Sequence, residues 1–356
     1  AASDVYKRQA MHWATAAGDL ALGNLAPAEA ASWFQRALDH ARSLGRPDEE
    51  QADLLVRLGV AQRRAGDPAA HGTVIEAGKL AERSGAADVL VRAALANEHI
   101  LVRVAAVDEE MLSLVEAALA VADRDDTATY ATLLAIYALQ LVPTPRAELR
   151  QRVAHEAIEL VEQSPDALAL PRMISALQFA LWGPGALPLR RELADRASTA
   201  ADAGADLYLQ FWTSRAAFNV AVESADAAGS ASALGRMQAL AAEVGEPTLR
   251  WVLGLTEVFD LTMRARLDEA DQLSGRMVEL GTQIGEPDAF SLYAGQLFVL
   301  RSFAGRYEVL MSLLEDVVAA NPDVLPFRLA RAIGCCAVGR TDEAAEVLAA
   351  GASAGF

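Results

Sequence analysis

The chain has 356 residues, 53% of them hydrophobic but only 6% aromatic, and 48 acidic residues against 31 lysines and arginines leave a formal charge of −17. This length exceeds the usual size of one compact domain, so we expect either two globular domains or one elongated array. Because so acidic a surface repels phosphate backbones, we expect this segment to bind no nucleic acid.

No apolar run is long enough to span a membrane, and the N-terminus lacks the apolar core of a signal peptide. We therefore expect no membrane partner and a cytoplasmic location. The two cysteines, Cys335 and Cys336, are adjacent and form no disulfide framework, which fits a reducing compartment. They could form a reactive dithiol, but we favour their interpretation as small buried helix residues.

The two ends of the chain look atypical. Residues 4–9 resemble the translation of a sequencing-adapter end, so we expect residues 1–9 to be a non-native leader and the native chain to start near Ala10. The alternative is a disordered basic leader. Residues 351–356 end without an obvious helix cap, and we expect them to be the truncated start of further repeats.

A repeat of forty residues runs between these ends. Glycine–X–proline turns at 45–47, 245–247 and 285–287 share one register; Gly85 lies in it, and Gly204 misses it by one residue. A glycine just past a helix takes the left-handed conformation that closes it, and a following proline cannot continue it. Each repeat therefore ends at a helix terminus.

A second break near the middle of each unit predicts two helices of about 17 residues per repeat. These breaks lie at 24–27, 66–68, 142–145, 183–185, 264–267 and 305–306. The chain is thus predicted to be all-α, an α-α superhelix of about nine helix pairs in a single array. The pairs are expected at 10–45, 48–85, 86–123, 126–163, 165–204, 205–245, 246–285, 286–321 and 322–350.

Small and large apolar residues alternate on one helix face at Ala31, Phe34, Ala37 and Leu38, a pattern typical of the second helix of a tetratricopeptide repeat. Stacked pairs of this kind share one continuous core. The largest irregularity is the turn at 182–188, where we expect a wider loop that forms a kink or a junction between sub-domains.

The sequence shows no catalytic or metal-binding motif. The five histidines are scattered without metal-ligand spacing, and residues 123–126 lack the spacing of a calcium loop, so they are interpreted as a polar connection. We therefore expect no enzymatic activity in this chain, no cofactor and no bound metal.

The concave face of such an array can bind a protein or a small-molecule effector. Polar and aromatic side chains predicted for this groove are Arg150, Arg172, Tyr208, Trp212, Arg215, Trp251, Tyr293 and Gln296. For Trp212 and Trp251 we favour packing between alanine-rich helices over ligand binding.

Several stretches resemble one bacterial group: 180–185 (Ala-Leu-Trp-Gly-Pro-Gly), 293–301 with Gly305-Arg306 after it, 313–315, 321–322 and 340–344. They are similar to the tetratricopeptide-like C-terminal half of large signal-transduction ATPases of actinobacteria and related groups. The resemblance spans about residues 20–356. It implies a preceding AAA-type nucleotide-switch ATPase and an output that is either a class III adenylate or guanylate cyclase or a LuxR-type DNA-binding domain.

The motifs of those ATPase and output domains are absent from these residues, so no catalytic residue carries over. Three hypotheses follow. The first is a sensor and scaffold region of such a multidomain signalling or transcriptional regulator. The second is a free-standing adaptor that binds a peptide or protein in the same groove. The third, an enzyme on a helical scaffold, ranks last because no convergent acids or metal ligands are evident.

Overall fold

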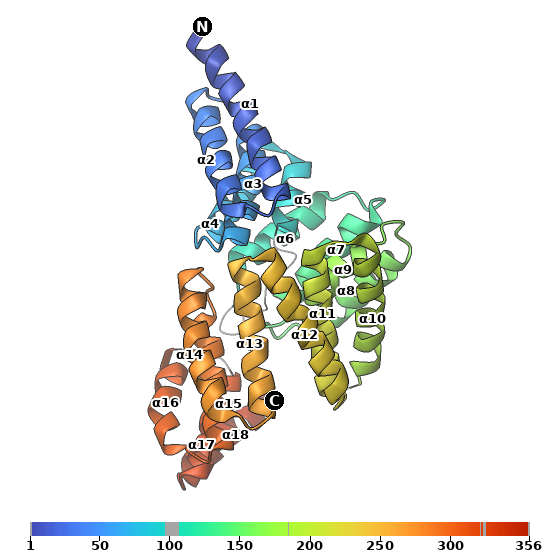
Figure 1. The fold of residues 1–356 in the computed structure, drawn as a ribbon. Helices are drawn as coiled ribbons and strands as arrows, with labels where there is room; N and C mark the ends of the chain where they lie inside the picture. Colours follow the sequence, from blue (N-terminus) through green and yellow to red (C-terminus); the bar gives the residue numbers. More distant parts are fainter. Residues whose placement is uncertain (1, 97–106, 184, 321, 323–324, 355–356) are drawn as a thin grey trace. The chain divides into compact units, whose positions relative to one another are not determined.

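A computed structural model describes the chain except for residues 1, 97–106, 184, 321, 323–324 and 355–356 (Figure 1). The described residues form 18 α-helices and one 3-10 turn, and the all-α prediction is confirmed. The helices follow one another as nine pairs. In chain order the first twelve are α1 (Ala2–Gly23), α2 (Pro27–Ser43), α3 (Asp48–Ala65), α4 (Ala70–Ser84), α5 (Ala87–Leu95), α6 (Glu109–Val121), α7 (Thr127–Gln140), α8 (Ala147–Glu162), α9 (Ala169–Ala180), α10 (Leu187–Gly204), α11 (Leu207–Glu223) and α12 (Ala227–Val244).

The remaining elements are α13 (Pro247–Met263), α14 (Leu267–Gln283), α15 (Ala289–Phe303), the 3-10 turn η1 (Glu308–Leu310), α16 (Met311–Ala320), α17 (Leu325–Ala337) and α18 (Thr341–Ala354). Each predicted mid-unit break falls between two helices. The two ends of the chain differ from expectation. Residues 2–9 form the first turns of α1, which begins at Ala2. At the other end, α18 extends past residue 350 to Ala354. The non-native origin of residues 1–9 stays a prediction.

The helices divide into two compact units. Of the described residues, unit 1 holds 2–96, 107–183, 185–253 and 283–285, and unit 2 holds 254–282, 286–320, 322 and 325–354. The irregular turn at 182–188 lies inside unit 1, where it connects α9 to α10; its Pro184 lies outside the described residues.

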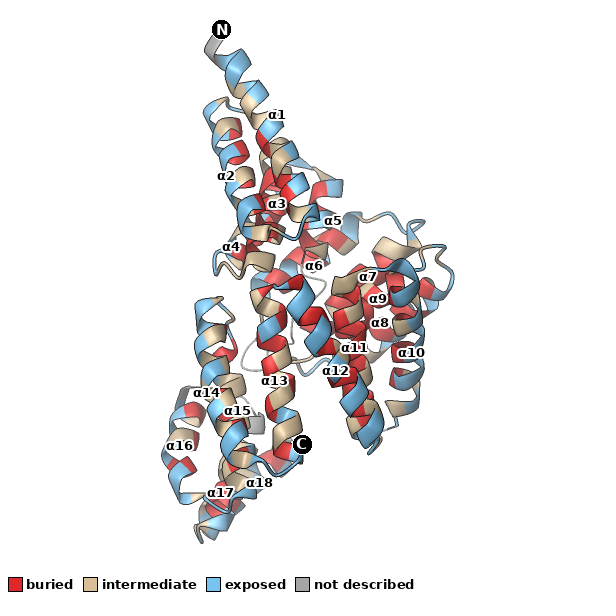
Figure 2. Cartoon of the chain, viewed as in Figure 1, coloured by how far each residue is buried: buried red, intermediate tan, exposed pale blue. Residues whose placement is uncertain are grey.

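Unit 1 is a stack of two helix layers. Each helix packs against the next along the chain, and α3, α5, α7, α9 and α11 also contact one another in succession. These odd-numbered helices therefore form one layer. Buried residues line the packed faces of these helices (Figure 2). They form two clusters, one spanning α1 to α7 and the other α7 to α11, and Leu119 and Tyr137 pack against both. The core is continuous along this stack, as the repeat predicts.

Small residues let these helices approach closely. Fully buried alanines such as Ala37, Ala77 and Ala118 occupy helix crossings. At Gly78 an added Cβ would lie 2.4 Å from the end of the Leu114 side chain, so a larger residue where α4 meets α6 would require Leu114 to move. The alanine-rich composition is thus a packing requirement of the stack.

Unit 2 has smaller cores. Val258 of α13, Ala270 of α14 and Leu300 of α15 form one cluster, and a second joins η1 to α16, α17 and α18. Cys335 is buried in this second cluster, but Cys336 is exposed, so the prediction that both cysteines are buried is wrong for Cys336. Adjacent helix residues point about 100° apart, which places one of them away from the core.

Left-handed residues end the helices at a regular interval. Positions 205, 225, 245, 265, 285 and 305 all have positive φ, follow the ends of α10 to α15, and are 20 residues apart. At 225 the amide of Asp226 donates to the Ala221 carbonyl at 2.8 Å, the bond of a Schellman cap. Position 205 explains why Gly204 misses the predicted register: the left-handed residue is Ala205, with φ 53°.

Ala225→Gly should stabilise the chain, because Ala225 is exposed and held at φ 56°. Relief of the left-handed conformation, offset in part by a more flexible unfolded chain, predicts a gain of about 0.5–1 kcal/mol. Gly245→Ala, where an added Cβ meets open space, should lose about 1 kcal/mol. Urea denaturation measures both changes.

Ala231→Gly is the control, because Ala231 is exposed in the interior of α12, the helix that follows the Ala225 cap. It should destabilise the chain by about 1 kcal/mol. Destabilisation by Ala225→Gly to the same extent as by Ala231→Gly would contradict the left-handed cap at 225.

Candidate functional site

A cleft of about 710 Å³ opens in unit 1 along the layer of odd-numbered helices. Four arginines line it: Arg63 and Arg64 at the end of α3, Arg92 on α5, and Arg172 on α9. We call this site the arginine cleft. The other residues that line it are Asp206, Tyr208 and the small or apolar Leu22, Gly23, Leu25, Val56, Val60, Leu95, Ala96, Leu207, Leu209 and Val244.

A carboxylate holds each of three of these guanidinium groups. Arg172 donates through Nη1 to Asp166 at 2.6 Å, and Arg92 pairs through Nη1 with Asp53. Burial works to raise the pKa of Asp53, but hydrogen bonds from Arg92 and Arg57 outweigh it and lower the pKa below its ordinary value. Asp53 therefore stays ionised at neutral pH and keeps Arg92 in place.

Arg64 forms the third pair and joins distant parts of the sequence. Its Nε donates to Glu246 at 2.5 Å across 182 residues, and its guanidinium lies 5.5 Å from the centre of the Tyr208 ring. Nearby, the Thr248 hydroxyl donates to the Arg63 carbonyl at 3.3 Å. These contacts connect the end of α3 to Glu246 in the turn before α13 and to Thr248 in the first turn of α13. We call the Arg64–Glu246 pair the clamp.

Glu246 is only 1% exposed, and its second carboxylate oxygen has no hydrogen-bond partner among the described residues. Burial raises the pKa of Glu246 above its ordinary value even though Arg64 acts to lower it. Burial, helped by the nearby Glu246, also raises the pKa of Tyr208, so its phenol stays neutral. The clamp is therefore a buried ion pair with an incompletely bonded carboxylate.

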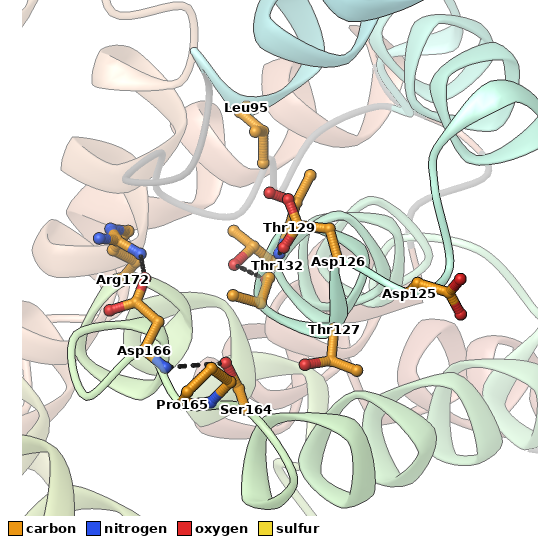
Figure 3. Close-up of a pocket in the computed structure, with 11 residues that line it drawn as sticks. Leu95, Asp125, Asp126, Thr127, Thr129, Thr132, Ser164, Pro165, Asp166 and Arg172 are labelled. Carbon is orange, nitrogen blue, oxygen red and sulfur yellow. Dashed lines mark hydrogen bonds and ion pairs between the residues drawn. The ribbon is translucent and has the colours of Figure 1, made fainter.

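A second pocket, of about 470 Å³, adjoins the arginine cleft and shares Leu95 and Arg172 with it (Figure 3). Asp125, Asp126 and Asp166 line it together with hydroxyl side chains. We call it the aspartate pocket.

Two of the aspartates in this pocket already form hydrogen bonds within the chain. Asp126 accepts from the Thr129 amide at 3.2 Å and so caps α7. Asp166 accepts from the Leu168 amide at 2.9 Å, and its pair with Arg172 lowers its pKa. The prediction that residues 123–126 form a polar connection agrees with their place between α6 and α7.

Two of the residues predicted for the groove, Arg172 and Tyr208, line the arginine cleft. Trp212 and Arg215 continue from Tyr208 along α11: the Tyr208 and Trp212 rings are 6.2 Å apart, and the Arg215 guanidinium lies 5.9 Å from the Trp212 ring. Burial lowers the pKa of Arg215 to about 10, so it stays charged at neutral pH.

The other predicted residues do not line the cleft. Trp212 and Trp251 are each 1% exposed, which fits the packing interpretation. Arg150 is half-buried on α8 and does not line the cleft. Tyr293 and Gln296 lie on α15 of unit 2, where Gln296 accepts a hydrogen bond from Ser274 at 2.6 Å.

The sequence analysis missed Arg63, Arg64, Arg92 and Glu246. A signal for Arg92 was present, because it lies 80 residues, or two repeats, before Arg172. No comparable signal marks the clamp, since its two partners occupy different repeat positions.

The described residues also bear on metal binding and on membrane insertion. They contain no group of three or more His, Cys, Asp and Glu side chains placed to hold a metal ion; His99 lies outside them. None of the helices that could be assessed combines the length and the apolar character needed to cross a membrane.

No protein-family model matches this chain, and no curated protein matches it by sequence. Its fold is similar to the crystal structure of a Signal Transduction ATPase with Numerous Domains (STAND) protein with a tetratricopeptide repeat sensor from Pyrococcus horikoshii. The TM-score is 0.50 at 12% identity, over 90% of this chain and 51% of that one. The chain thus spans about half the length of that protein, and the likeness concerns the fold alone.

Glu246→Gln should change how stability depends on pH. Because the folded-state pKa of Glu246 is above its ordinary 4.5, the folded chain binds more protons between these two values. The contribution of Glu246 is therefore fully present below pH 4.5 and is lost as pH rises through the folded-state pKa. Wild type should lose stability relative to Glu246→Gln over this interval in urea titrations.

Asp166→Asn is the matched control with the opposite sign, because pairing with Arg172 lowers the pKa of Asp166. Wild type should gain stability relative to this variant as pH rises through the acid range. If wild type also gained stability relative to Glu246→Gln as pH rises, the pairing with Arg64 would lower the pKa of Glu246 more than burial raises it. That result would contradict the raised pKa described here.

Proposed function

We propose that this chain is the sensor and scaffold region of a multidomain signal-transduction ATPase and performs no chemistry of its own. The observation that carries this proposal is the fold likeness to the STAND protein with a tetratricopeptide repeat sensor, which extends over 90% of the chain. The arginine cleft supports it as a place where an effector could bind.

In the proposed mechanism an effector binds the arginine cleft and changes the relative free energies of two states of the attached ATPase. A ligand can shift such an equilibrium only by its difference in affinity for the two states. The clamp could produce such a difference in affinity between the two states. It joins α3 to the turn before α13 beside the cleft, so its making or breaking could alter the scaffold around the bound effector.

The output of the regulator, a nucleotide cyclase or a LuxR-type DNA-binding domain, follows from the resemblance of 180–185 and 293–301 to bacterial regulators. Use of ATP would place the protein in the cytoplasm.

Sequencing outward from both ends of the source gene tests the proposal. We expect a continuous upstream reading frame with a Gly-x-x-x-x-Gly-Lys-Ser/Thr phosphate-binding loop. Start and stop codons directly flanking the present sequence would contradict it and would favour a free-standing adaptor that uses the same helices to bind a peptide or protein.

A further inference from the structure

We propose that the ligand of the arginine cleft is a small amphipathic organic anion, with an apolar body and a negatively charged head group. This inference deepens the proposed function and rests on it for the role of the ligand as an effector, but not for binding itself.

The charge of the cleft is the first argument. Four arginines line it against one carboxylate, Asp206, which accepts the Leu209 amide at 3.0 Å and caps α11. The carboxylates that pair with Arg64, Arg92 and Arg172 are not among the residues that line the cleft; they are Glu246, Asp53 and Asp166. In a chain with 17 more acidic than basic residues, a lining with four arginines and one carboxylate contrasts with the overall composition, although carboxylates behind the lining pair with three of the arginines.

The second argument is the number of donors left to a ligand. A guanidinium has five N–H donors. Among the described residues, one hydrogen bond each is formed by the guanidiniums of Arg64, Arg92 and Arg172, to Glu246, Asp53 and Asp166 respectively. The carboxylates thus orient the guanidiniums while leaving N–H groups for a bound anion, which lowers the ordering cost of binding.

The third argument is the shape and polarity of the rest of the site. Val56, Val60, Leu95, Leu207 and Val244 give it apolar walls. A simple inorganic anion would leave these walls in contact with water, whereas an attached hydrocarbon or ring would cover them. The volume of about 710 Å³ falls within the range of about 300–1,000 Å³ that is usual for small-molecule sites.

The test uses two fluorescent dyes that differ in one charged group. Anilinonaphthalene sulfonate has an apolar ring system with a sulfonate, and phenylnaphthylamine has the same rings without it. Titrated into the whole chain, the sulfonate should bind at least about tenfold more tightly, as expected for charge-assisted hydrogen bonds. Its affinity should fall with added salt, while that of the neutral dye should not.

Variants locate the binding. Arg92→Gln and Arg172→Gln should each weaken binding of the sulfonate by about tenfold and leave phenylnaphthylamine unchanged. Arg196→Gln is the control: Arg196 pairs with Glu162 of a neighbouring helix but does not line the cleft, so its loss should have no effect on either dye. Urea denaturation of each variant confirms that it is folded.

Equal binding of the two dyes, or full retention of sulfonate binding by both cleft variants, would overturn the proposal. The salt dependence of the unmodified chain keeps the test decisive even if a variant fails to fold. Since the dyes report on this chain alone and gene sequencing reports on its neighbours, failure of the ligand class is distinguishable from failure of the sensor function.

Discussion

The rest of the structure depends on the left-handed residue that closes a helix every 20 positions through much of the chain. From 205 to 305 this interval is constant, so helices of similar length follow one another and equivalent side chains recur every 40 residues. Arg92 and Arg172 occupy the same position two repeats apart and line one cleft. The constraint outweighs local preference, because alanine occupies the strained conformation at 205, 225 and 265.

The electrostatics of the cleft follow from where the carboxylates lie. The chain is strongly acidic, yet the acids that pair with Arg64, Arg92 and Arg172 are outside the cleft lining, so the guanidiniums are held without being enclosed. Arg64 has the additional task of joining α3 to a turn 182 residues later. A buried pair of this kind contributes little net stability but leaves a costly unpaired charge if one partner is lost. The clamp therefore fixes how α3 and the turn before α13 pack together more than it adds to the stability of the fold.

Much of the fold was predictable because glycine and proline mark helix ends directly. The nine pairs follow from the turns at 45–47, 245–247 and 285–287, whereas Ala205 gives no such signal and Gly204 seemed to miss the register. Of the site, Arg172 and Tyr208 were predicted. The clamp was not, because a contact between different repeat positions leaves no periodic trace in one sequence. Tyr293 and Gln296 were grouped with the others although they belong to unit 2.

The two proposals together describe a helical scaffold that would hold an anionic effector against its odd-numbered helices. A crystal structure of the chain with anilinonaphthalene sulfonate tests it most directly. The account predicts the sulfonate within hydrogen-bonding distance of Arg92 or Arg172, with the rings against Leu95 and the other apolar walls. A cleft closed by its own side chains, or a dye bound only elsewhere on the chain, would contradict it.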